Sequence, residues 1–384
     1  MKHVLTGLAL CAVTGGIARA QSSVEPWLEL SADGRWDDYL PNGGQGYVAR
    51  IAPGAGVRLH TPRLVLRLEG YAAYDRYEPT TSNGPVPDSW NGHTLGSLDY
   101  RATRRLTLHA SDAFADVRDP REIDRLGVVT PPGVQIVDNL AGAKAEYAAT
   151  RLVTLDSGYA FRYTRFGDVA GMPTPGGDEH DVTGGASLKF TPNDIARAGW
   201  RTQFFVVGDG AQTQTPTLGL WHKLNRIVWA QAEGGPMFFD SPATGRAVSW
   251  YAKGVLLADW PHLRMMASYD RDFVGGTGAA PVIWANFVAG TIRYRPWRYL
   301  DLQARGDYFR NGLAPNQDLL VDGYDVWGEL VAHLSRGFQL GGYYAYRQQF
   351  DHGMAGIFGF RRDLVGIRLT AILAPSPRMT QEVQ

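Results

Sequence analysis

Cysteine, long apolar runs and an excess of either charge are scarce or missing in this sequence of 384 residues. Cys11 is the only cysteine, so a disulfide within the chain is excluded. No run of 18 apolar residues follows Ala20, which excludes a membrane-spanning helix there. The 38 basic residues balance 38 acidic ones, and this argues against nucleic acid as a partner because phosphate binding requires an excess of Lys and Arg. A nucleotide-binding loop is also missing, so the sequence predicts neither an energy source of its own nor a cofactor.

The N-terminus has the pattern of a secretory signal peptide. A short basic start precedes the mostly apolar residues Val4–Ile17, and Ala18–Ala20 form a small-x-small cleavage site. The apolar stretch is too short to span hydrocarbon as a helix. We therefore expect residues 1–20 to be removed, so that the mature chain begins at Gln21. It then has no thiol, which suits an oxidising envelope compartment.

Apolar and charged residues alternate over long stretches of the remaining chain. From Leu64 to Tyr74, every second residue is apolar or small, and the other face of the pattern holds Arg67, Glu69 and Asp75. Because successive side chains of a strand point to opposite faces, this pattern predicts a two-faced strand of more than ten residues. A tilted membrane strand needs about 9 to 11 residues, whereas soluble strands usually have about five or six. Similar alternation returns after Leu152, Leu300 and Val365.

Two kinds of connection separate the predicted strands. Short turns are expected at His60, Ala102, Ala149, Pro192, Leu224, Pro261, Arg295 and Leu334, and several of them carry a basic residue just before the next alternation. Longer polar loops are expected at residues 38–46, 78–91, 118–137, 165–179, 210–213, 238–246, 274–281, 311–322 and 351–361. Nine long loops and eight short turns join 18 strands and leave both termini on the short-turn side.

The sequence therefore predicts an all-β protein, a single closed antiparallel transmembrane β-barrel of about 18 strands, with short periplasmic turns and longer extracellular loops. The mean hydropathy of -0.22 fits such a barrel, because only every second strand residue meets lipid. A β-propeller, whose blades recur about every 40 to 45 residues, is disfavoured because each repeat here holds two long strands instead of four short ones. Aromatic residues gather near the strand ends, as two membrane girdles require; they are Trp27, Tyr74, Tyr77, Tyr100, Phe161, Tyr163, Trp221, Trp260, Tyr294, Trp297 and Tyr299.

The signal peptide, strand number and turn style together resemble Gram-negative outer-membrane β-barrel proteins of the porin type. The resemblance covers about Pro26–Leu373 and implies a barrel at residues 21–373, surrounded by outer-membrane lipid and passing polar solutes. The chain departs from many such proteins because a polar tail at residues 374–384 follows the last strand in place of a terminal aromatic residue. In size it is also similar to the barrels of outer-membrane polysaccharide export systems, which implies an exported polysaccharide as cargo and other export or envelope proteins as partners.

Placing the charged faces inward defines a predicted pore lining. Barrels of about 16 to 18 strands enclose more volume than side chains fill, so water or an inserted loop must occupy the rest. Both signs of charge are present, so we predict no ion preference, and we expect about half of these groups to pair across the wall. The predicted pore-lining residues are Arg67, Glu69, Asp75, Asp156, Arg162, Glu233, Lys253, Arg264, Asp270, Asp301, Gln303, Arg305, Asp307, Glu329, His333, Arg347 and Arg368.

Two other functions stay open on the sequence alone. One is a structural or adhesive surface barrel whose lumen is plugged, with residues 118–137 as the natural plug. The other is an outer-membrane hydrolase, because His109 and Ser111 share one strand face and such a His-x-Ser pair resembles the site of barrel lipid A deacylases. Acidic groups at residues 178–181 and 318–325 offer oxygen ligands to Ca²⁺, although acidic surface loops are usually only solvated. We predict a pore, without catalytic residues and without a metal or cofactor site.

Overall fold

The computed structural model describes residues 22–40, 44–80, 86–118, 134–167, 176–206, 210–275, 282–314, 318–352 and 359–373. The predicted signal peptide at residues 1–20 and the predicted tail at residues 374–384 lie outside them. No helix in the described part of the chain is long and apolar enough to cross a membrane. The strands are β1 (Ser23–Asp37), β2 (Gly46–His60), β3 (Leu64–Pro79), β4 (Ser89–Arg101), β5 (Leu106–Val117), β6 (Ile136–Ala148), β7 (Val153–Phe166), β8 (Gly177–Lys189), β9 (Asp194–Val206), β10 (Ala211–Lys223), β11 (Val228–Ser241), β12 (Gly245–Asp259), β13 (Leu263–Gly275), β14 (Val282–Trp297), β15 (Leu300–Leu313), β16 (Leu319–His333), β17 (Phe338–Asp351) and β18 (Phe360–Ile372).

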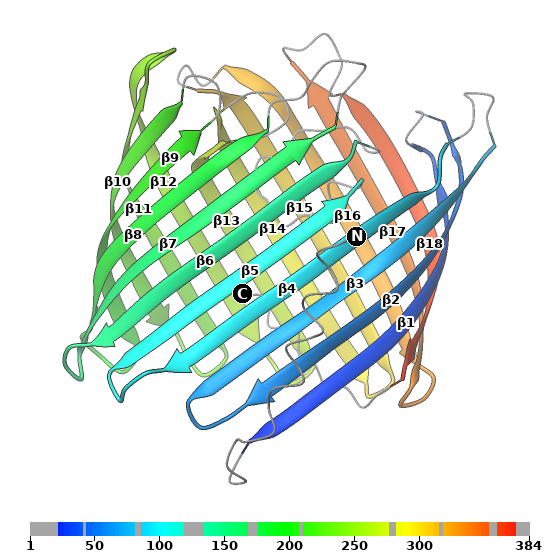
Figure 1. Ribbon diagram of the computed structural model, residues 1–384, viewed down its shortest axis with the longest axis horizontal. Coiled ribbons are helices and arrows are strands. Elements are labelled where there is room, and N and C mark those ends of the chain that lie inside the picture. Colours follow the sequence, from blue (N-terminus) through cyan, green and yellow to red (C-terminus); the bar gives the residue numbers. More distant parts are fainter. Residues whose placement is uncertain are drawn as a thin grey trace, which may run out of the picture.

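The 18 strands form one closed antiparallel sheet. Each strand pairs with its neighbours in sequence, and β1 pairs with both β2 and β18. The closing register runs from Glu29 opposite Ile372 to Asp37 opposite Leu364. Figure 1 shows the tilted strands running round a wall, with short turns along its lower rim. The structure confirms the predicted all-β barrel and its 18 strands.

Hydrogen-bonded side chains shape the short turns. Thr61 Oγ1 accepts hydrogen bonds from the backbone N–H groups of Arg63 at 3.3 Å and Leu64 at 2.9 Å. Ser, Thr and Asn favour such local turns because their oxygen atoms reach backbone donors two and three residues ahead. A sequence signal for these turns is therefore a Thr or Asn three residues before the next strand. The same pair of bonds recurs at Thr103, Thr150 and Asn225.

Several predicted loops are shorter than the sequence suggests, for example the one at residues 238–246. Residues 238–246 were expected to form a long polar loop, but β11 continues to Ser241 and β12 begins at Gly245. Ser241 pairs with Gly245, so the two strands form a tight hairpin. Gly245 has a φ of 83°, a conformation that residues with a Cβ rarely adopt, and this explains a glycine at the turn. The prediction failed here because aromatic and polar residues of a strand end look like loop residues in sequence.

Large apolar residues cover the outer wall. On β3, Leu68 is 39% exposed, and it alternates with Arg67 and Glu69 on the other face. A continuous band of exposed apolar side chains is unfavourable in water, but lipid covers it. The wall is therefore that of a membrane-spanning barrel, the architecture of Gram-negative outer membranes. Exposed members of the band include Ile51, Leu155, Leu218, Leu256, Val288, Leu340 and Ile367.

Three of the predicted girdle aromatics face the interior instead. Tyr77 packs beside Val48 and its hydroxyl lies 3.1 Å from Ser89 Oγ. Trp27 and Trp221 alternate with exposed leucines of the outer wall, so their rings lie on the inner face. Position near a strand end is thus an incomplete signal for a girdle, because it does not distinguish the two faces.

Asp112 is an acidic residue on the outer wall. It shares its face with exposed Leu108 and Phe114, and it lies opposite Gly96 of β4 and Ala141 of β6. An acidic side chain in hydrocarbon is unfavourable, although less so than the about 2–4 kcal/mol of Lys or Arg at the midplane. We expect Asp112→Leu to raise the free energy of unfolding by about 1 kcal/mol, measured by urea unfolding from phospholipid vesicles. Leu108→Asp should have the opposite sign, and a destabilising Asp112→Leu would contradict the lipid-facing assignment.

Candidate pore-lining surface

All 17 predicted pore-lining residues lie on the inner face of the wall. On each strand they occupy the positions that alternate with the exposed apolar residues. The pairing registers agree from strand to strand; for example, Asp75 lies opposite Arg50, and Gln303 lies opposite Glu329. Whether solutes pass along this face is a separate question, and the pore-lining role stays a prediction.

Asp75 is the centre of a buried ionic network on β1 to β4. Its carboxylate is 1% exposed and accepts two hydrogen bonds from Arg50, at 2.6 and 2.8 Å. Asn91 Nδ2 donates to the same carboxylate at 2.8 Å, and Arg35 lies 3.8 Å from it. The bidentate contact and the additional donors replace the water that the carboxylate loses on burial. These contacts tie four neighbouring strands together.

A second network joins β7, β9 and β11. Arg197 Nη2 lies 2.7 Å from Asp156 Oδ2, and its Nη1 lies 2.9 Å from Glu233 Oε1. Arg162 is 3.6 Å from Asp138 on β6. The sequence alone selects the carboxylates but misses Arg197, which lies on the same face as both of them. The alternation of β9, where Arg197 and Arg201 occupy one face, is the signal that identifies it.

Near the short turns, Asp301 contacts two arginines and a histidine. Arg295 pairs with it directly, Arg293 lies 3.5 Å away, and His333 Nε2 lies 3.1 Å away. Further inner pairs join Lys253 to Asp270 at 3.9 Å, Arg305 to Asp307 at 3.1 Å, Arg368 to Glu329 at 3.5 Å and Arg67 to Glu69 at 2.8 Å.

Pairing is more complete than the expected half. Among the described residues, 13 of the 17 predicted pore-lining residues lie within 3.9 Å of an oppositely charged side chain, and His333 Nε2 lies 3.1 Å from Asp301. Arg347 lies over the rings of Phe309 and Phe360, at 5.4 and 5.7 Å from their centroids. The inner face therefore presents neutral pairs instead of a field of one sign.

The two halves of the inner face differ in exposure. Towards the loops, Asn91, Gln203 and Arg362 are almost fully buried. Arg362 pairs with Asp37 at 2.5 Å, a contact that sequence analysis misses because the two residues lie on β18 and β1. Towards the short turns, several charged inner side chains stay open, such as those of Lys253 and Arg305 at 47% and 45% exposure, whereas Asp301 is buried. The interior is packed at the loop end and more open at the turn end.

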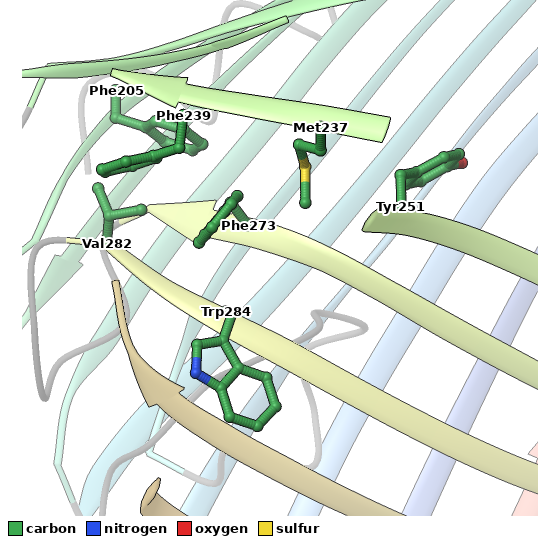
Figure 2. Packing of buried hydrophobic residues seen from close by; sticks show 7 residues of the cluster. All are labelled: Phe205, Met237, Phe239, Tyr251, Phe273, Val282 and Trp284. Carbon is green, nitrogen blue, oxygen red and sulfur yellow. The ribbon is translucent and has the colours of Figure 1, made fainter. Parts of the chain in front are cut away.

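The loop end of β13 lies inside the barrel. The pairing of β12 with β13 runs from Asp259 opposite Arg264 only as far as Ala252 opposite Arg271. Beyond that point, Asp272 pairs with Arg201 of β9, and the carbonyl oxygen of Phe273 accepts a hydrogen bond from Gln203 of β9. Figure 2 shows Met237 and Phe239 of β11 directed towards Phe273 of β13 and Val282 of β14. The end of β13 therefore occupies part of the space inside the barrel. The sequence suggested residues 118–137 as the plug, but most of that loop lies outside the described residues.

The residues proposed for chemistry are not arranged for it. His109 Nδ1 lies 2.5 Å from Asp99 Oδ1, and its Nε2 has no hydrogen-bond partner, so Ser111 is not bonded to a base. A hydroxyl nucleophile requires that bond. Asp178 lies on the opposite face of β8 from Glu179 and Asp181, so the three carboxylates do not converge. Within the described ranges, no group of three His, Cys, Asp or Glu side chains is placed to hold a metal ion.

Comparisons with known proteins find similarity only among solved structures. No protein-family model matches the chain, and no curated protein sequence matches it. The crystal structure of Acinetobacter baumannii OccAB2 has 12% identity and a TM-score of 0.45, with 91% of this chain and 98% of that chain covered. Pseudomonas aeruginosa OccK5 (OpdH) has 12% identity and a TM-score of 0.47, covering 92% and 98%. The outer membrane protein opdK of Pseudomonas aeruginosa has 10% identity and a TM-score of 0.47, covering 92% and 99%.

Proposed function

We propose that this barrel is a water-filled pore that passes small polar solutes across an outer membrane. The observation that supports the proposal is the open, charged inner face near the short turns. Lys253, Arg305 and Arg368 keep 43% to 47% of their side-chain surface exposed inside a closed wall. A charged group that lacks full protein contacts needs water, because desolvating it costs several kcal/mol. A hydrated interior is therefore the arrangement that these side chains favour.

The pairing of charges bears on which solutes such a pore would select. Because most inner carboxylates have a cationic partner, the wall offers hydrogen-bond donors and acceptors without a large net field. We infer that the pore favours neutral or weakly charged polar solutes. An exported polysaccharide is chemically similar to such solutes, and its passage through the pore stays a prediction. The binding of export or envelope proteins as partners also stays a prediction. The adhesive alternative depends on loops that lie largely outside the described residues.

Solute flux into vesicles tests this function. Phospholipid vesicles containing the folded protein should swell in isotonic pentose, hexose and disaccharide, at rates that fall as the solute becomes larger, because a narrowed lumen passes small solutes faster. Vesicles prepared with heat-unfolded protein provide the control. Swelling rates no higher than those of the control for every solute would contradict the pore. Equal rates for the sugars and for a long dextran would instead favour polysaccharide passage.

A further inference from the structure

Among the described strands, none pairs with one edge of β12 beyond Ala252, because the end of β13 lies inside the barrel. β12 pairs with β11 as far as Gly245, which lies opposite Ser241. Its pairing with β13 ends earlier, where Ala252 lies opposite Arg271. Continuing the register by two residues would place Trp250 opposite Phe273. The two strands thus separate at a fork, and each has an edge whose backbone groups need other partners.

Side chains supply those partners on both edges of the fork. The carbonyl oxygen of Trp250 accepts a hydrogen bond from Arg271 Nε at 3.3 Å. The N–H of Phe273 donates to Asp272 Oδ1 at 2.8 Å, and its carbonyl oxygen accepts from Gln203 Nε2 at 3.4 Å. These are the same two residues that the continued register would join. Because unpaired backbone groups are costly, the side-chain contacts stabilise the separated arrangement.

Apolar packing and an ion pair hold the end of β13 against the wall. Phe273 is fully buried, with its ring centroid 4.9 Å from that of Phe239 on β11. Arg201 of β9 pairs with Asp272 and also with Asp181 at 2.6 Å. The end of β13 therefore has a defined docking place on the strands β8 to β12, inside the barrel.

The alternation of β13 suits a second position as well. Phe273 is separated by an even number of residues from Tyr269 and Met265, which lie on the outer face of β13. In a regular strand it would therefore share their face. Trp250 of β12 is 48% exposed on the same outer wall. If β13 paired with β12 to its end, Phe273 would meet lipid beside Trp250, and Asp272 would face the lumen. The apolar residue is kept from water in both arrangements.

We propose that the paired ends of β13 and β14, Asp272–Gly275 and Val282–Ala285, act as a gate. Docked on β8 to β12, they narrow the lumen; with β13 paired to the edge of β12 beyond Ala252, they widen the lumen. In the docked arrangement, side chains bond the backbone groups of Trp250 and Phe273. In the other arrangement, the two strands would bond the same groups by pairing. The two arrangements are therefore alternatives of one bistable element. The inference rests on the proposed function, since the paired ends are a gate only if the barrel conducts.

Disulfide locks test the gate in a Cys11→Ala background. Ser249→Cys with Val274→Cys joins positions that face each other only when β13 pairs fully with β12. Phe205→Cys with Gly275→Cys is designed to lock the docked arrangement, because Gly275 lies against the side chain of Phe205 there. The matched control, Gly254→Cys with Tyr269→Cys, joins residues that are already opposite each other below the fork.

Conductance in planar bilayers and cross-linking yield on gels give independent results. The first lock should form under oxidation and raise unitary conductance by about twofold or more, because conductance follows the open cross-section. The docked lock should lower it, dithiothreitol should reverse both, and the control should cross-link without effect. A first lock that never forms, or that forms without changing the conductance of a conducting barrel, rejects the gate alone. No conductance in any variant, including the control, rejects the pore.

Discussion

Replacing Asp75 with alanine should lower the free energy of unfolding by about 3–5 kcal/mol, the largest effect we expect from a single substitution. The carboxylate is buried, and its removal leaves Arg50 and Arg35 without the anion that they share. The side chain of Arg35 is only 8% exposed, so water does not replace the lost partner. Urea unfolding from phospholipid vesicles, followed by tryptophan fluorescence, measures the change.

The neighbouring residue Arg76 provides a matched control on the same strand. Arg76 also makes an ion pair, at 3.3 Å from Glu78, but both side chains are 65% exposed. Exposed pairs contribute little because water solvates the ions as well as the partner does, so Arg76→Ala should cost at most about 1 kcal/mol. Equal losses for the two variants would show that Asp75 is not buried as described.

Leu68→Arg should lower the free energy of unfolding by about 2–4 kcal/mol in lipid vesicles. Leu68 lies on the outer face of β3, four residues from Leu64 and six from Tyr74, and therefore near the middle of the apolar band. A guanidinium at this depth loses its water without gaining a partner. Unfolding titrations in vesicles measure the cost, and loss of heat-modifiable mobility on gels would report failed assembly.

Leu95→Arg is the same substitution on the opposite face of the wall. Leu95 is 37% exposed, nearly as much as Leu68, but it lies opposite Glu69 on the inner face of β4. If the interior is hydrated, the new guanidinium stays in water near a carboxylate, and Leu95→Arg should cost less than about 1 kcal/mol. A large loss of stability for Leu95→Arg together with none for Leu68→Arg would show that the inner and outer faces of the wall are assigned the wrong way round.

Period-two alternation and the spacing of turns were sufficient to predict the number and pairing of the strands, although not all of their ends. A strand such as β3 must place Leu68 and Arg67 on opposite faces, and only a wall between lipid and an interior suits both along its full length. The turn at Thr61 likewise depends on bonds between residues close in sequence. Features set by near neighbours are visible in the sequence for this reason.

The sequence predicts which face of the wall each candidate residue occupies, but it does not predict which side chain each one contacts. The alternation places Asp156 and Glu233 inside, yet nothing in the sequence indicates that Arg197 lies between them, since the three residues belong to three different strands. The inward end of β13 was missed for a related reason. Phe273 would share the outer face with Tyr269 and Met265 if β13 continued along the wall. Periodicity therefore does not reveal that the strand leaves the wall after Arg271.

The most direct test of the account is the accessibility of single cysteines to a membrane-impermeant thiol reagent in lipid vesicles, in the Cys11→Ala background. Gln303 and Ser97 lie on the inner face, and their neighbours Ala304 and Leu98 lie on the outer face. If a water column fills the lumen, Gln303→Cys and Ser97→Cys should react readily, while Ala304→Cys and Leu98→Cys should stay protected by lipid. Protection of both inner cysteines, or faster reaction of the outer pair, would contradict a hydrated pore.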